Sequence, residues 1–153
     1  MTKKNLLLLL LVVLLAGLSL YVNRHRFQKE ELRIGSRSLP PRGQLLRRTQ
    51  NQKSTANPVV FLLDRRTQLK SVKVVLLSEA RTNKYPHPVW ELISESNSVP
   101  LKDFAYGVNI RGMKPKVPGA QPEPLEPGVE YRVYVEAEGY KAHHDFTPVP
   151  RTR

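Results

Sequence analysis

The chain has 153 residues and contains no cysteine, which excludes disulfides, thiolate metal sites and cysteine nucleophiles. Lysine and arginine number 25 against 13 aspartate and glutamate residues, a formal net charge of +12. Such an excess favours anionic partners, namely lipid head groups, nucleic acid or an acidic polymer. The length allows one ordinary domain, built from the residues after about position 57.

An apolar, leucine-rich run near the N-terminus, residues 6–22, predicts a membrane helix. Two lysines precede it, and Arg24 and Arg26 follow it. Such a helix is about 26 Å long, close to the roughly 30 Å hydrocarbon core of a bilayer. We therefore expect a basic tail over residues 1–5 and a transmembrane helix or signal anchor over residues 6–23. The expected anchoring residues are Leu6, Leu10, Leu14, Leu18 and, at the interface, Tyr21.

Two questions about this segment stay open in the sequence. A cleaved signal peptide would share its basic start and apolar run, but no A-x-A cleavage pattern follows. The greater number of Lys and Arg residues after the run places the C-terminal part in the cytoplasm. The short basic N-terminal tail is instead typical of export signals. We favour an uncleaved, single-pass membrane protein with an extracytoplasmic C-terminal domain.

Residues 24–57 read as a basic, flexible linker. They hold nine Lys or Arg residues against Glu30 and Glu31, and are rich in Pro, Ser, Gln and Asn from residue 36 onward. The first turns, as far as Ile34, could continue the helix until Gly35 ends it. A sharper alternative is a polybasic strip that binds anionic lipid or polymer. Its candidate residues are Arg24, Arg26, Arg33, Arg37, Arg42, Arg47 and Arg48.

After residue 58 the pattern changes to short apolar runs of strand length, at residues 59–63, 72–77 and 89–93. A weaker strand candidate covers residues 104–110. Residues 112–127 contain five prolines, which exclude a helix or a central strand there.

The clearest strand covers residues 130–137. Tyr131, Val133, Val135 and Ala137 alternate with polar residues, as expected for a sheet with one buried face. A Glu-Gly turn then leads to a hairpin partner over residues 140–147. The sequence predicts a mainly β chain, with a small antiparallel β-sandwich or barrel over residues 58–148 and a tail over residues 149–153.

Residues 125–137 (LEPGVEYRVYVEA) resemble the L-x-P-G-x-x-Y-x-V-x-V-x-A segment of fibronectin type III domains. The resemblance implies an immunoglobulin- or fibronectin III-like sandwich in which Tyr131 forms a tyrosine corner. It also implies that Leu125 packs beneath the turn containing Gly128, and that Trp90 matches the core tryptophan of an early strand. Residues 97–124 do not match. The resemblance implies architecture and not activity.

Catalytic chemistry has little support in the sequence. His143 and Asp145 can share one face of a strand, but His144 points to the other, and two ligands do not make a metal site. No nucleophile elbow, phosphate-binding glycine loop or zinc-protease motif occurs. We predict no catalytic residue, metal, cofactor or small-molecule substrate. An enzyme using His143, Asp145, Lys114 and Lys116 stays the least supported hypothesis.

The sequence therefore favours a membrane-anchored, non-catalytic β-domain that acts as a binding or structural module at the cell envelope. Its expected partners are the lipid bilayer and an envelope protein or anionic polymer. The alternative is a cytoplasm-facing membrane protein whose polybasic juxtamembrane segment binds anionic lipid or nucleic acid. Nucleic acid is the less favoured ligand, because residues 36–58 contain no aromatic side chain on which bases could stack.

Overall fold

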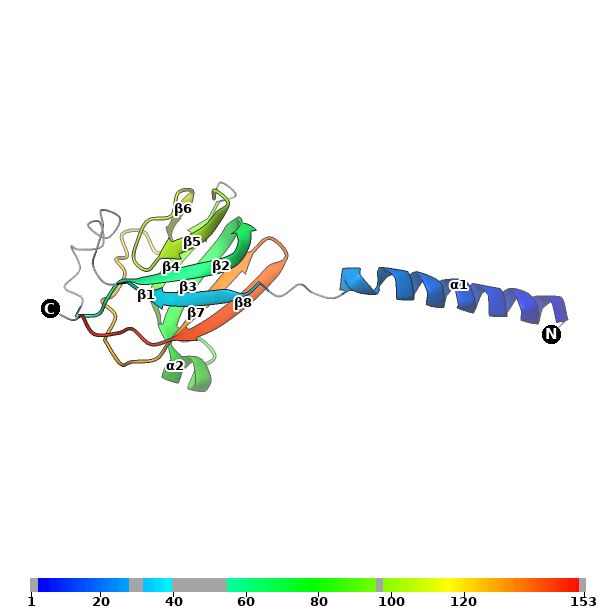
Figure 1. The fold of residues 1–153 in the computed structure, drawn as a ribbon, viewed down its shortest axis with the longest axis horizontal. Helices are drawn as coiled ribbons and strands as arrows, with labels where there is room; N and C mark the ends of the chain where they lie inside the picture. The colour runs from blue at the N-terminus through cyan, green and yellow to red at the C-terminus, as the bar shows by residue number, and fades with distance from the viewer. Residues whose placement is uncertain (1–2, 28–31, 40–54, 96–97, 152–153) are drawn as a thin grey trace. The chain divides into compact units, whose positions relative to one another are not determined.

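The computed structural model describes residues 3–27, 32–39, 55–95 and 98–151 (Figure 1). The chain divides into two compact units, Met1–Glu30 and Glu31–Arg153. The first contains helix α1, and the second contains the strands, which form a β-domain.

Helix α1 spans Lys3–Phe27, so the helix expected within residues 6–23 is confirmed as a helix. Leucine has a high helix propensity and the segment contains no proline, so nothing in it interrupts the backbone hydrogen bonds. The expectation of helical turns as far as Ile34 is wrong, because Ile34 begins a strand. Within the described ranges, the structure contains no helix that is both long and apolar enough to cross a membrane.

The β-domain contains two antiparallel sheets, which confirms the mainly β, sandwich-like prediction. One sheet has the strand order β1-β2-β5, and the other has the order β6-β4-β3-β7-β8. Their bounds are β1 Ile34–Ser38, β2 Val59–Thr67, β3 Leu69–Leu76, β4 Pro88–Ser94, β5 Leu101–Ala105, β6 Met113–Pro115, β7 Tyr131–Ala137 and β8 Tyr140–Phe146. The chain passes from one sheet to the other between β2 and β3, which only Gln68 separates.

Aromatic side chains from both sheets meet in the core. Phe61 of β2 lies with its ring centroid 5.2 Å from that of Phe104 of β5 and 5.0 Å from that of Phe146 of β8. Trp90 of β4 packs against Phe104 at 6.4 Å. Strand β7 alternates as predicted, with Tyr131, Val133, Val135 and Ala137 buried. Burial of these apolar side chains between the sheets is the main source of the domain's stability.

Strand β1 corrects the expectation that residues 24–57 form a linker throughout. It pairs with β2 from Ile34↔Leu63 to Ser38↔Val59, and Leu32 just before it is buried in the core. The segment IGSRS shows no hydrophobic alternation, so the strand is stabilised by pairing with β2 and not by a pattern of its own. Residues 28–31 and 40–54, with Arg42, Arg47 and Arg48, lie outside the described residues.

The end of the chain is also part of the domain. The expected tail, residues 149–153, begins after Pro148, yet Asn57 N–H donates to Val149 O at 2.8 Å and Arg151 N–H donates to Thr55 O at 2.9 Å. These bonds tie the residues before β2 to the residues after β8.

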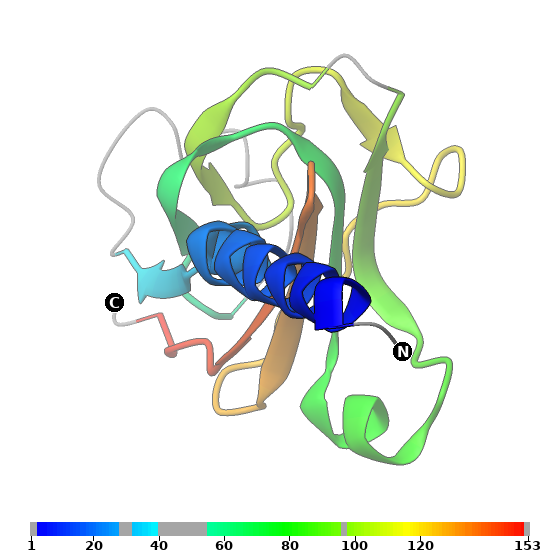
Figure 2. The same ribbon diagram turned by 90° about the vertical axis from the view of Figure 1, so that its right-hand side faces the viewer.

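Three further elements differ from the sequence prediction or refine it. Strand β5 ends at Ala105, earlier than the predicted residues 104–110, because a turn with a left-handed Gly107 (φ 72°) follows it. The short helix α2, Leu77–Thr82, was not predicted, since six residues are too few to show a helical period. It projects from the β-domain (Figure 1, Figure 2). Strand β6, within the proline-rich stretch, lies at a sheet edge, where proline is tolerated.

Candidate functional site

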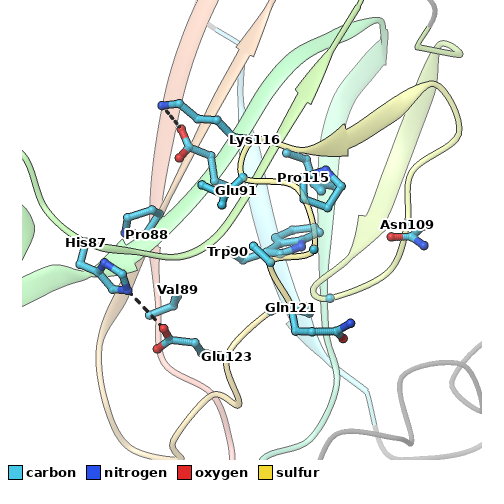
Figure 3. A pocket seen from close by; sticks show the side chains of 16 residues that line it. His87, Pro88, Val89, Trp90, Glu91, Asn109, Pro115, Lys116, Gln121 and Glu123 are labelled. Atoms are coloured by element: carbon cyan, nitrogen blue, oxygen red, sulfur yellow. Dashed lines mark hydrogen bonds and ion pairs between the residues drawn. The ribbon is translucent and has the colours of Figure 1, made fainter.

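A groove of about 680 Å³ lies beside the outer edge of β4 (Figure 3). Strand β4 contributes residues 88–92 to it, the connection after β5 contributes Gly107 and Asn109, and the segment of residues 115–123 forms the opposite wall. The groove is therefore built from three parts of the chain that are distant in sequence.

The opposite wall bows outward because it has more residues than the strand it follows. Lys116 N–H donates to Glu91 O at 3.3 Å, and Glu123 N–H donates to Val89 O at 2.9 Å. Between these two anchors β4 has one residue, Trp90, whereas the wall has residues 117–122. The surplus residues turn back at Gly119, whose φ of 80° is one that side-chain-bearing residues rarely adopt. A hollow therefore remains between the wall and the strand.

Tyr106 connects the C-terminal end of the wall, at Glu123, to β4. Its ring lies 5.1 Å from that of Trp90, and its hydroxyl donates to Glu123 O at 2.7 Å, with Val89 O at 3.3 Å. Burial raises the pKa of the Tyr106 hydroxyl well above its usual value, so it stays a hydrogen-bond donor. Tyr106 thus fixes Glu123 of the wall to β4, next to Trp90 of the lining.

Two polar contacts join side chains around the groove, one an ion pair and the other between a histidine and a carboxylate. Lys116 Nζ lies 2.9 Å from Glu91 Oε1, and His87 Nε2 lies 3.2 Å from Glu123 Oε1 (Figure 3). Asn109 and Gln121 add uncharged amides to the lining. Hydrophobic and aromatic walls with a few polar groups are typical of binding pockets. The lining offers apolar contact and amide hydrogen bonds.

The histidine cluster of β8 is not brought together as a catalytic site. His143 and Asp145 lie on the outer face of the sheet, as their alternation predicts, but Asp145 is held by two bonds from Arg132, at 2.6 and 2.8 Å. His144 points inward, and its Nε2 lies 3.0 Å from the Ser36 hydroxyl of β1. Among the described residues, no group of three or more His, Cys, Asp or Glu side chains is arranged to hold a metal ion.

The residues assigned to a tyrosine corner lie together at the start of β7. The Tyr131 hydroxyl accepts a hydrogen bond from Glu126 N–H at 3.1 Å, and Leu125 is buried nearby in the core. Gly128 has φ 81°, as the turn between them requires. Trp90 is a core residue as expected, but it lies on the fourth strand and not on an early one, where Phe61 fills the core instead.

The structure describes only some of the expected anchor and polybasic residues. Leu10, Leu14, Leu18 and Tyr21 are exposed on α1, which also contains Leu6, Arg24 and Arg26. The side chains of these last three lie outside the described set. Arg33 and Arg37 belong to the β-domain, and both are exposed.

Sequence reasoning did not find the groove. Tyr106, Gln121 and Glu123 belong to no sequence motif. The feature that reveals the groove is that residues 117–122 lie opposite the single residue Trp90 of β4, and this is visible only in the fold. Comparison of the chain with known protein families, with curated proteins and with solved structures found no match in any of the three.

Proposed function

We propose that this chain is a membrane-anchored, non-catalytic β-domain that acts as a binding or structural module at the cell envelope. Helix α1 is the anchor, and the groove beside β4 is the binding site. A fibronectin III-like architecture belongs to the same proposal, and the Tyr131–Glu126 hydrogen bond supports it.

The observation that carries the anchor is the exposure of apolar side chains on every side of α1. Leu10, Leu11, Val12, Val13, Leu14 and Leu15 are each 52–63% exposed. Six successive residues, at about 100° each, surround the whole helix. A helix that is apolar all round is stable only when an apolar medium covers it. A bilayer supplies that medium without any partner protein.

The groove supports a ligand that is neutral and partly apolar. The Lys116–Glu91 ion pair offsets one positive and one negative charge of the lining, and proline rings and side-chain amides are there to contact a ligand. A short segment of an envelope protein or polymer suits this lining better than a charged small molecule does.

Membrane fractionation of the full chain tests the anchor. We expect the chain in the membrane fraction, resistant to extraction at high pH, and expect Leu11→Lys with Leu14→Lys to release it. The matched control is Leu62→Lys, which adds a charge at a leucine that is 43% exposed on β2. An equal release of the control and the α1 variant would contradict the anchor.

Site-specific cross-linking tests the groove. A photoreactive residue at Gln121 should form an adduct in membranes, and one at Ser78 on α2 should not. Ala120→Trp, which fills the groove from its exposed wall, should abolish the adduct. An adduct that persists in Ala120→Trp would exclude the groove as the binding site. A reporter fused after Arg153 would establish on which side of the membrane the domain lies.

A further inference from the structure

Among the described residues of the β-domain, one end contains more cations than acids. At this end β1 begins, β2 turns into β3, and β7 turns into β8 (Figure 1). Two contacts connect these turns across the end: Asp64 N–H donates to Arg33 O at 3.1 Å, and the Arg65 guanidinium lies 5.7 Å from the Tyr140 ring centroid. We call this part the basic end.

Two more segments reach the basic end. The Ser98 hydroxyl donates to Leu69 O at 2.7 Å, and Val99 N–H donates to Arg111 O at 3.4 Å. These bonds place Val99 and Arg111 beside the first residue of β3. Val99 is apolar and 44% exposed, so an exposed hydrophobic side chain stands among the cations.

Charge is distributed unevenly over the described part of the β-domain. The basic end contains eight Lys or Arg residues against four acidic ones, whereas on the rest of the described domain the two signs balance. The cations are Arg33, Arg65, Arg66, Lys70, Lys102, Arg111, Lys114 and Lys141, and the acids are Asp64, Glu95, Glu136 and Glu138.

Several of these cations have no ion-pair partner among the residues that the structure describes. Three of the acids are already engaged, in the pairs Arg65–Asp64, Lys114–Glu95 and Lys141–Glu136. Five cations are exposed and form no ion pair within the described ranges, namely Arg33, Arg66, Lys70, Lys102 and Arg111. Their exposure makes them accessible to an external anion.

The covalent chain limits how far this end can lie from α1. Only residues 28–31 separate Phe27, the last residue of the helix, from Leu32, which is buried in the β-domain. A fully extended chain covers about 3.3–3.6 Å per residue, so the two residues are at most about 18 Å apart in any arrangement. Covalent connectivity alone therefore keeps Leu32, just before β1, within about 18 Å of the last residue of the helix.

We propose that the basic end binds the head groups of an anionic lipid bilayer, with Val99 entering the interface. The inference rests on the proposed membrane anchor and names a second contact of the same domain with the membrane. Cations near an anionic surface are attracted within about a Debye length, roughly 8 Å at physiological salt.

Spin labels on the full chain test this contact, since a chain without native cysteine can carry one label at a chosen site. The label is placed at Val99→Cys or, as a control on α2 at the other end, at Ser78→Cys. The probes are vesicles of phosphatidylcholine alone and of phosphatidylcholine mixed with phosphatidylglycerol. We expect the label at position 99 to lose access to a water-soluble relaxation agent several-fold on the anionic vesicles only, and the label at position 78 to keep its access.

Charge reversal makes the test specific. Arg66→Glu with Lys70→Glu should restore access at position 99, as should high salt, whereas the matched pair Arg81→Glu with Lys84→Glu should not. Equal access at position 99 on both kinds of vesicle, with the chain bound to both, would overturn the basic-end contact alone. A chain that binds neither kind of vesicle would overturn the membrane anchor and this inference with it.

Discussion

The hydroxyl of Tyr131 accepts a hydrogen bond from Glu126 N–H at 3.1 Å in a largely buried position. Removal of one partner of such a bond costs about 1 kcal/mol of unfolding free energy. Tyr131→Phe should therefore lower the denaturant midpoint of the β-domain. Tyr85→Phe, at a side chain that is 77% exposed, is the control and should leave the midpoint unchanged. Equal midpoints for both variants would show that the hydroxyl contributes nothing to the turn.

Tyr106 connects the fold to the groove, because its hydroxyl donates to the carbonyl of Glu123. In Tyr106→Phe the carbonyl of Glu123 loses this donor while the ring packing against Trp90 remains. We expect faster amide hydrogen exchange at Glu123 and its neighbours in the wall, with the exchange of β7 unchanged. Unaltered exchange in the wall would mean that the two backbone anchors hold it without Tyr106.

Asp145 should make the stability of the β-domain depend on pH in the acidic range. The hydrogen bonds from Arg132 hold the pKa of the Asp145 carboxyl below its usual value of 3.8. A carboxyl with a lowered folded-state pKa stabilises the fold above its unfolded pKa and loses that contribution as the pH falls through the folded value. The denaturant midpoint should therefore decrease below about pH 4, and decrease less in Asp145→Asn. The same decrease in both proteins would assign the acid sensitivity to other carboxyls.

At the scale of elements, β1 shows how a weakly patterned segment becomes part of a core. Its five residues pair with β2, and Leu32 before it is buried with the aromatic cluster. Leu32→Ala should cost about 2–5 kcal/mol, as for other buried leucines, and Leu62→Ala on the exposed face of β2 should cost less than about 0.5 kcal/mol. Chemical unfolding of the two variants makes the comparison. Similar small losses would place Leu32 outside the core.

On the polar face of the five-stranded sheet, acidic side chains are engaged in cross-strand pairs. Ser71 of β3 donates to Glu136 of β7, and Lys141 of β8 lies 2.8 Å from the same carboxylate. The hydrogen bond from Lys141 lowers the pKa of Glu136. Cross-strand pairs of this kind satisfy side chains on a solvated face and contribute modestly to sheet pairing. The acidic residues there are structural partners.

At the scale of the whole molecule, the β-domain begins well before the boundary expected at residue 58. A chain that starts at Glu31 should fold and unfold cooperatively, whereas a chain that starts at Pro58 lacks β1 and leaves the edge of β2 unpaired. We expect the shorter chain to be less stable by several kcal/mol, or to aggregate, as measured by thermal unfolding. Equal melting temperatures would show that residues 32–57 contribute nothing to the stability of the domain and act as a linker.

Local pattern made a large part of this fold predictable. The alternation in β7, the Glu138–Gly139 pair and the leucine run are patterns of neighbouring residues. The structure contains a strand, a turn and a helix, respectively, at these places. Strand β1, helix α2 and the end of β5 escaped prediction for the opposite reason. Their conformation depends on pairing with β2, on packing of Leu77, and on a turn at Gly107.

The sequence by itself determined a mainly β domain after an apolar helix, because periodicity, proline and glycine act through the backbone of neighbouring residues. Only the tertiary structure decided where the domain begins, where its groove lies and which cations gather at the end where β1 begins. Glu123 reaches Val89 across 34 positions, and Arg33 reaches Asp64 across 31. Contacts over such separations depend on how two sheets pack, and no local pattern of residues records them.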